Sequence, residues 1–109
     1  MNNKKNNIHN FLIEKCRKKD TKAQFKIYEM YYKAMFNTSL RIINNSGTAE
    51  DIMQESFLSA FNNIDSYTEN VSFGAWLKKI VINKSLDYLK KEKKMYLYSI
   101  EESNVIETL

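Results

Sequence analysis

The stretch FGAWLKKIVINKSLDYLKKEKK, residues 73–94, carries the strongest indication of the fold in this sequence. At 100° per residue its apolar side chains fall into two arcs on nearly opposite sides of a helix. One arc holds Phe73, Leu77, Ile80, Val81 and Tyr88, and the other holds Ile82, Leu86 and Leu89. A surface helix needs only one apolar arc, so this pattern predicts a long helix packed between neighbouring helices.

Polar groups occupy the remaining window of this helix. At positions i, i+3, i+7, i+11 and i+14 stand Trp76, Lys79, Asn83, Asp87 and Lys90, which we call the polar row. An aromatic surface for stacking, cations for phosphates and an amide that donates and accepts are the groups that hold unpaired nucleic acid. A core role for Trp76, an ion pair between Asp87 and Lys91, and a solvated lysine run explain the same residues separately. Spacing alone leaves both interpretations open.

The composition favours helices throughout. The chain has 109 residues, enough for one domain, and 43% of them are hydrophobic. It contains no proline and only two glycines, whereas a sheet protein uses both residues in its many turns. We therefore predict a single all-α domain, a compact bundle of three to four helices.

Cysteine and histidine usage excludes several classes of site. Cys16 is the only cysteine, so an intrachain disulfide is impossible, and with one histidine we expect neither a metal site nor a cofactor. No nucleophile and base or phosphate-binding loop is visible, so the sequence predicts that the protein is not an enzyme. It contains no apolar run of about 18 residues and no signal peptide, which favours a cytoplasmic protein without membrane insertion.

Charge is segregated along the chain. Residues 1–49 carry ten basic and three acidic side chains, whereas residues 50–70 carry five acidic and no basic ones. Residues 71–94 return to seven basic against two acidic side chains, and residues 95–109 hold three acidic ones. The basic blocks predict a polyanionic partner, and the central acidic block predicts that a different partner docks there.

Three helices are expected before the long one. The first spans 8–19, the second spans 22–45 and the third runs from Thr48 to Ile64. The expected inward-facing residues of the first are Ile8, Phe11, Leu12 and Cys16. Those of the second are Phe25, Tyr28, Tyr32, Met35, Phe36, Leu40 and Ile43, and those of the third are Met53, Phe57, Ala60, Phe61 and Ile64.

Boundary residues suggest where these helices begin and end. Asp20 or Thr21 is expected to cap the second helix, and Ser72 the long one. Gly47 is expected to end the second helix in the left-handed conformation. Thr48, with Asp51 three residues later, is expected to form a capping box at the start of the third.

One face of the third helix is polar and exposed in this arrangement. At i, i+3, i+4, i+7 and i+11 it carries Asp51, Gln54, Glu55, Leu58 and Asn62. A row of acceptors around an exposed leucine is suited to a basic partner helix. Helix capping and solubility explain the same acids without a partner, and both explanations stay open.

Two motifs in this order resemble the second conserved region of bacterial sigma factors of the extracytoplasmic-function class. The stretch from Glu50 to Phe57 is similar to the pattern E-D-apolar-apolar-Q-E-x-F of that family. The family's F-x-x-W-L spacing, with the following isoleucine, asparagine and aspartate, is matched by Phe73, Trp76, Leu77, Ile80, Asn83 and Asp87. The resemblance covers roughly residues 20–94.

The resemblance implies a region 2 domain over residues 1–94, with 95–109 as a linker toward a helix-turn-helix domain that this sequence lacks. It implies docking on the clamp helices of the RNA polymerase beta-prime subunit through Asp51, Gln54, Glu55 and Leu58. It also implies recognition and melting of the promoter −10 element, with capture of an unstacked base of the non-template strand. The residues assigned to DNA are Tyr67, Asn70, Ser72, Trp76, Lys79, Asn83, Lys84, Asp87 and Lys90.

The expected function is therefore transcription initiation, with RNA polymerase core and promoter DNA as partners and room for an anti-sigma factor. The main alternative is a helical interaction or regulatory module without sequence-specific DNA binding. A third interpretation is a non-specific single-strand binder. Only the sigma interpretation requires Trp76, Lys79 and Asn83 to be exposed and to face a common groove; the interaction-module alternative does not.

Overall fold

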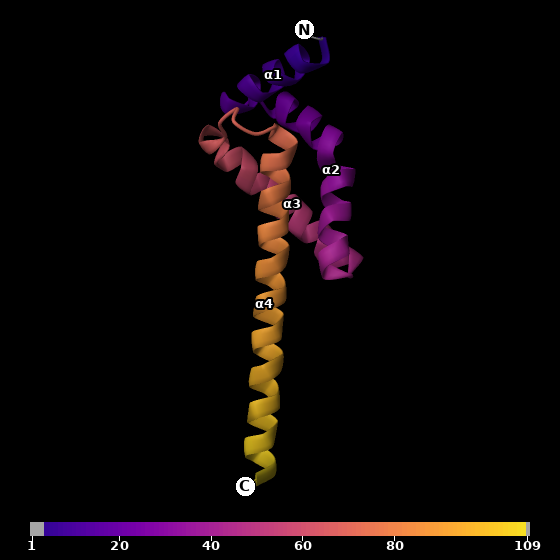
Figure 1. Cartoon of the computed structure of the whole chain (residues 1–109), viewed down its shortest axis with the longest axis vertical. Helices are drawn as coiled ribbons and strands as arrows, with labels where there is room; N and C mark the ends of the chain where they lie inside the picture. Colours follow the sequence, from indigo (N-terminus) through magenta and orange to yellow (C-terminus); the bar gives the residue numbers. More distant parts are fainter. Residues whose placement is uncertain (1–3, 109) are drawn as a thin grey trace.

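The computed structural model of the chain describes residues 4–108, and it describes the side chains of residues 8–104. The described residues form four α-helices and one 3-10 helix (Figure 1). The helices are α1 (Lys4–Arg17), α2 (Thr21–Ile43), α3 (Ser46–Asn62) and α4 (Phe73–Thr108), with η1 (Ile64–Ser66) between the last two. This architecture confirms the predicted all-α class.

Helices α2, α3 and α4 pack against one another, and α1 lies across one end, where it contacts α2 and η1 (Figure 1). The aromatic centre of the core is Phe73, whose ring is 5.4 Å from that of Tyr67 and 5.6 Å from that of Tyr31. Leu77 and Val81 follow it along α4 and are fully buried. The first half of α4 is therefore a wall of the core, as its apolar pattern predicts.

Two of the predicted caps are confirmed. The Asp20 carboxylate accepts hydrogen bonds from the backbone N–H groups of Lys22, at 2.9 Å, and Ala23, at 3.2 Å, and so begins α2. The Ser72 hydroxyl oxygen accepts from the N–H of Ala75 at 3.2 Å at the start of α4. Each cap satisfies backbone donors that have no partner inside the helix.

The turn between α2 and α3 differs from the prediction. The left-handed residue is Asn44, with φ 61°, and Gly47 lies inside α3 with a negative φ. The N-cap is Asn45, whose side-chain oxygen accepts from the N–H of Thr48 at 2.9 Å. The predicted roles of Gly47 and Thr48 are therefore wrong, because Asn44 ends α2 and Asn45 caps α3, each three residues before the residue predicted for that role. Asparagine tolerates the left-handed conformation and is also among the best N-caps.

The predicted inward face of α2 is partly wrong. Phe25 is 60% exposed, while the buried residues of this helix are Ala23, Ile27, Met35 and Ser39. Small side chains let α2 approach α4 closely: the Ser39 and Ser85 hydroxyl oxygens are 2.9 Å apart and both residues are fully buried. A hydrophobic pattern does not register such residues, because their contribution is size and hydrogen bonding.

A similar shift occurs in α1 and in the second arc of α4. Ile8 and Phe11 are 60% exposed, and Ile13 is buried beside Cys16. Leu86 is 43% exposed. The prediction that neighbouring helices enclose the second arc is therefore wrong for this part of α4. Helix α1 contacts only one end of the bundle, and α4 leaves the bundle beyond this point (Figure 1).

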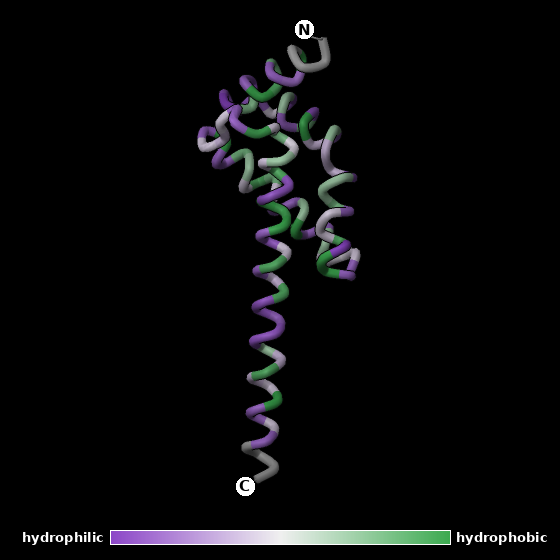
Figure 2. Tube along the Cα trace, in the orientation of Figure 1, coloured by the Kyte–Doolittle hydropathy of each residue, from purple (hydrophilic) through white to green (hydrophobic). Residues whose placement is uncertain are grey.

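Helix α4 continues through the segment that was predicted to be a linker. Every described side chain from Lys90 to Asn104 is exposed, and the helix extends alone from the bundle (Figure 2). The whole structure accordingly measures 70 × 25 × 23 Å. Because nothing packs on this part, its sequence carries no helical apolar pattern. Among the described residues, no helix has the length and apolarity that crossing a membrane requires.

Candidate nucleic-acid interface and docking face

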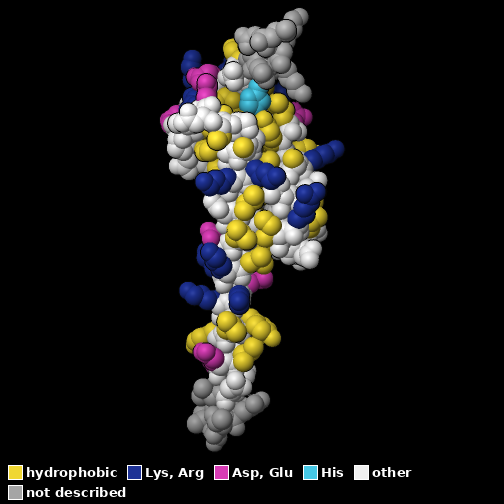
Figure 3. Space-filling model, in the orientation of Figure 1, with side chains coloured by type: hydrophobic (Ala, Val, Ile, Leu, Met, Phe, Trp, Pro, Cys, Tyr) yellow, Lys and Arg dark blue, Asp and Glu magenta, His cyan; other side chains and the backbone are white. Residues whose placement is uncertain are grey.

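The polar row lies on an accessible surface of α4. Lys79, Asn83, Asp87 and Lys90 are exposed, and Trp76 at the start of the row is partly buried. Asp87 forms no ion pair with Lys91 in the described structure, so that simple explanation of Asp87 does not hold. On the face seen in Figure 3, basic side chains flank exposed hydrophobic ones along α4, as a surface for a phosphate chain carrying bases requires.

Three further residues assigned to DNA differ in accessibility. Asn70 and Ser72 are exposed in the loop before α4, where Ser72 also caps the helix. Lys84 is partly buried beside the polar row. Asn70 and Ser72 are therefore available at the surface, a few residues before Trp76 in the sequence, whereas Lys84 is less accessible.

Tyr67 is placed differently from the other predicted DNA contacts. Its ring is buried, lies 5.4 Å from the ring of Phe73 and 5.2 Å from that of Trp76, and its hydroxyl donates to the carbonyl of Val71 at 2.9 Å. Burial raises the pKa of the Tyr67 phenol, and the nearby Glu69 adds to this while Arg17 opposes it. The phenol thus stays protonated and braces the loop from inside.

Arg17 was not singled out from the sequence, yet it connects α1 to this loop. Its guanidinium donates to the carbonyls of Ile64, at 2.9 Å, and Tyr67, at 3.0 Å. It also bonds the Glu14 carboxylate at 3.1 Å and lies 3.8 Å from that of Asp65. The available signal is that Arg17 is an arginine in a run of lysines, since a guanidinium can bridge two acceptors.

The predicted docking residues lie together on the outer face of α3. Asp51, Gln54, Glu55 and Leu58 are exposed, and Leu58 retains 64% of its accessible surface. Neither carboxylate of this face is in an ion pair within the described part of the chain. We call these four residues the docking face; its charge is uncompensated and its leucine has no neighbour that covers it.

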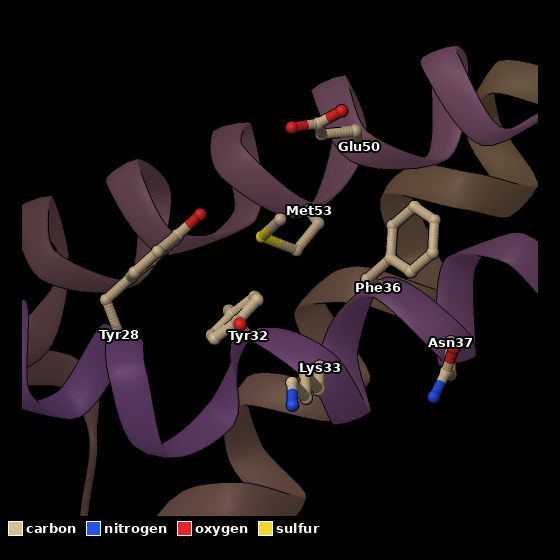
Figure 4. Close-up of a pocket in the computed structure, with 7 residues that line it drawn as sticks. All are labelled: Tyr28, Tyr32, Lys33, Phe36, Asn37, Glu50 and Met53. Carbon is tan, nitrogen blue, oxygen red and sulfur yellow. The ribbon is translucent and has the colours of Figure 1, made fainter.

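An apolar groove between α2 and α3 borders the docking face. One part, of about 420 Å³, is lined by Tyr28, Tyr32, Lys33, Phe36, Asn37, Glu50 and Met53. In Figure 4 the side chains of Tyr28, Tyr32, Phe36 and Met53 lie between the two helices, whereas those of Lys33 and Asn37 point away from this space. Tyr28 also lines a second part, which includes Phe25, Gln54 and Leu58. The exposed Phe25 thus stands across the groove from the docking face.

The part of the chain that the structure describes has no group of three or more His, Cys, Asp or Glu side chains able to hold a metal ion. Two titratable side chains, Cys16 and His9, lie in surroundings that shift their pKa: Cys16 is buried and His9 is partly buried. Burial, with a smaller effect of Asp20, raises the pKa of Cys16 to about 11. Burial lowers the pKa of His9, whose Nε2 is 2.7 Å from the Tyr31 hydroxyl.

Comparison with known proteins agrees with this arrangement. The family model for sigma-70 region 2 matches residues 27–95, which include all of the docking face and the polar row. The chain therefore belongs to the sigma-70 region 2 family. Its matched relatives include sigma factors of the extracytoplasmic-function (ECF) class, which confirms the resemblance found in the sequence.

Individual relatives give the extent of the similarity. The ECF RNA polymerase sigma factor SigW of Bacillus subtilis (strain 168) is 35% identical over 89 residues, which cover 82% of this chain and 48% of SigW. The ECF RNA polymerase sigma-E factor of Escherichia coli (strain K12) is 31% identical over 78 residues, covering 72% of this chain and 40% of that protein. The chain thus spans about half, or less, of the length of these relatives.

A solved structure is similar in three dimensions. It is the NMR structure of an engineered region 2 of sigmaE in complex with GTAAAA, with a TM-score of 0.73 and 29% sequence identity. The superposition covers 80% of this chain and 90% of that one. The bundle described above is therefore the fold of a sigma region 2 domain.

Proposed function

We propose that this protein is a sigma-factor domain that docks on RNA polymerase and holds the melted −10 strand of a promoter for transcription initiation. The observation that carries the proposal is the polar row of α4, in which Lys79, Asn83, Asp87 and Lys90 are exposed and Trp76 is partly buried. The row lies within the region matched by the sigma-70 region 2 model. The relatives named above are RNA polymerase sigma factors, and the similar solved structure was determined in complex with GTAAAA.

The docking face supports polymerase binding through the beta-prime clamp helices. Asp51 and Glu55 lie one turn apart, are exposed and have no ion-pair partner in the described structure, so a basic partner helix gains attraction without breaking an existing pair. Leu58 continues this face, and the groove beside it accepts an apolar side chain of the partner. Removing Leu58 and Phe25 from water would strengthen the complex.

The polar row supports capture of a single strand. Lys79 and Lys90 supply charge for phosphates, and their contribution makes binding fall steeply as salt rises. Stacking of one base on an aromatic side chain contributes ~1–3 kcal/mol, which offsets the few kcal/mol needed to remove that base from the duplex. Trp76 retains exposed surface for such stacking, and the amide of Asn83 donates to and accepts from base edges.

Tyr67 takes a different part in this proposal from that of a direct contact. Its ring packs against that of Trp76, with 5.2 Å between the ring centres, and its hydroxyl donates to the carbonyl of Val71 within the loop. Direct DNA contact by Tyr67 stays a prediction and requires the loop to open. Binding and strand separation, without bond breaking in the DNA, are the proposed work of the domain, and it is proposed to act beside polymerase in the cytoplasm.

The first test is a binding titration of the chain with a fluorescent fragment of the beta-prime clamp helices at matched salt. We expect Glu55→Lys to abolish binding, because it places a cation opposite a basic partner. Glu102→Lys, on the exposed end of α4, is the matched control and should bind as the parent does. Equal binding by Glu55→Lys and the parent would remove the docking face from the proposal.

The second test separates the proposal from its alternatives. Titrations with single-stranded DNA should show sequence preference that Asn83→Ala lowers, while Asn37→Ala, on an exposed position of α2, keeps it. Equal affinity for all sequences would favour a non-specific single-strand binder. Absence of both DNA and clamp-helix binding in a folded protein would favour the interaction-module alternative.

A further inference from the structure

One side chain outside the loop holds it in place. The loop runs from η1 to the start of α4, and Arg17 at the last position of α1 reaches across to it. Two different guanidinium nitrogens donate to two carbonyls three residues apart, Nη1 to Ile64 and Nη2 to Tyr67. The third nitrogen, Nε, bonds Glu14, so the guanidinium is fixed from both sides. Only 21% of this side chain is exposed.

The contact continues from Arg17 to the polar row. The Arg17 guanidinium carbon is 5.9 Å from the centre of the Tyr67 ring, and the same ring lies 5.2 Å from that of Trp76. Tyr67 also bonds Val71 near the other end of the loop. Substitution of Arg17 is therefore expected to displace both the loop backbone and the Tyr67 ring that packs against Trp76.

We propose that Arg17 is a positioning residue for base recognition: it fixes the loop and Trp76 in the geometry that holds an unstacked base. This inference rests on the proposed function of the polar row. The sigma-70 region 2 match begins at residue 27, so Arg17 and the whole of α1 lie outside it. Each of the three guanidinium nitrogens donates to a partner within the protein, and only 21% of the side chain is exposed. Arg17 is therefore expected to act through the loop and not by binding phosphate.

Substitution by lysine isolates this role. Arg17→Lys keeps the positive charge but loses the planar fork that bridges two carbonyls. We expect preference for the best sequence over a scrambled one to fall about tenfold, the size of losing one charge-assisted hydrogen bond. A phosphate contact predicts instead that Arg17→Ala reduces the slope of log affinity against log salt by roughly 0.7, whereas positioning leaves that slope unchanged.

The experiment uses the full chain and a pool of short single-stranded DNA with a randomised centre. The parent, Arg17→Lys, Arg17→Ala and the matched control Arg41→Lys are each used to enrich a motif, and the best sequence is then titrated. Arg41 is exposed at the end of α2, and its side chain has no hydrogen bond or ion pair in the described structure. Emission of Trp76, the only tryptophan, reports stacking of the base. Clamp-helix binding and thermal unfolding of each variant verify that it is folded.

The outcomes separate the inference from the proposed function. A motif enriched by the parent and Arg41→Lys but weakened in Arg17→Lys, with smaller Trp76 quenching and unchanged clamp-helix binding, supports the inference. The same motif and quenching in Arg17→Lys, or a reduced salt slope in Arg17→Ala, overturns it while the proposed function stands. If the parent enriches no motif, base recognition by the polar row fails, and the role of Arg17 fails with it. If Arg17→Ala does not fold, the inference is tested by the sequence preference and the Trp76 quenching of Arg17→Lys alone.

Discussion

The paired serines where α2 meets α4 allow a prediction that depends on the position of one proton. Ser85 donates its hydroxyl hydrogen to the carbonyl of Val81 at 2.8 Å. Its oxygen must therefore accept in the 2.9 Å contact with Ser39, and Ser39 must be the donor. The Ser39 hydroxyl has no other hydrogen-bond partner in the described structure, and both residues are fully buried.

This assignment predicts unequal effects of two alanine substitutions. Ser39→Ala removes a donor and leaves Ser85 bonded to Val81, so it costs about 1 kcal/mol, and the higher helix propensity of alanine returns about half of that. Ser85→Ala leaves a buried hydroxyl without an acceptor, which costs ~1–3 kcal/mol before the same correction. The double variant leaves no orphaned group and is expected within about 0.5 kcal/mol of the parent.

Urea unfolding followed by Trp76 fluorescence measures all three variants, and a double-mutant cycle gives the coupling between the two serines. We expect a coupling of roughly 1–2 kcal/mol, with the double variant more stable than Ser85→Ala alone. An equal or larger loss in Ser39→Ala would contradict the assigned direction of the hydrogen bond. DNA binding by folded Ser85→Ala should be unchanged, because Ser85 is fully buried.

Three further predictions concern other buried or capping groups. Burial raises the pKa of Cys16 to about 11, so the thiol should not react with a disulfide reagent at pH 8. Labelling should appear only as urea unfolds the chain, and rapid labelling of the native protein would contradict the burial of Cys16. Burial lowers the pKa of His9, so the unfolded chain binds a proton more readily than the folded one. The free energy of unfolding should therefore be constant above about pH 6.5 and fall below it, by no more than ~1.4 kcal/mol per pH unit. His9→Gln should remove this part of the slope in a pH series. Asp20→Ala removes the α2 cap and should lower the free energy of unfolding by ~1 kcal/mol in urea titrations, whereas Asp20→Asn, which keeps the acceptor, should lose less.

The sequence predicted the fold well where burial is apolar and regular. Phe73, Leu77 and Val81 are buried as their spacing indicated, and α3 is buried through Met53 and Phe57. The first half of α4 and the whole of α3 pack against neighbouring helices, so their buried residues recur with the 3.6-residue period of a helix. The family resemblance, carried by the same two helices, is confirmed by the region 2 match.

The features that the sequence did not predict depend on contacts that leave no periodic pattern. The buried contact of Ser39 with Ser85 uses small polar residues, and the α2–α3 turn uses Asn44 and Asn45 where glycine and threonine were predicted. The role of Arg17 depends on a partner 47 residues away, which no local pattern reveals. The polar row follows from spacing, whereas the burial of Tyr67 follows from how the loop folds back on Phe73.

Helix α4 joins two segments of very different local stability. Its first part is held by the core, while every described side chain from Lys90 to Asn104 faces water and an isolated segment of this length forms a helix only marginally. Warming should therefore melt the outer turns before the bundle opens. Circular dichroism at 222 nm would decline gradually in the range where Trp76 emission is still constant, and amide hydrogens of the outer segment would exchange orders of magnitude faster than those near Leu77. The two optical signals would therefore report two separate events in the same helix.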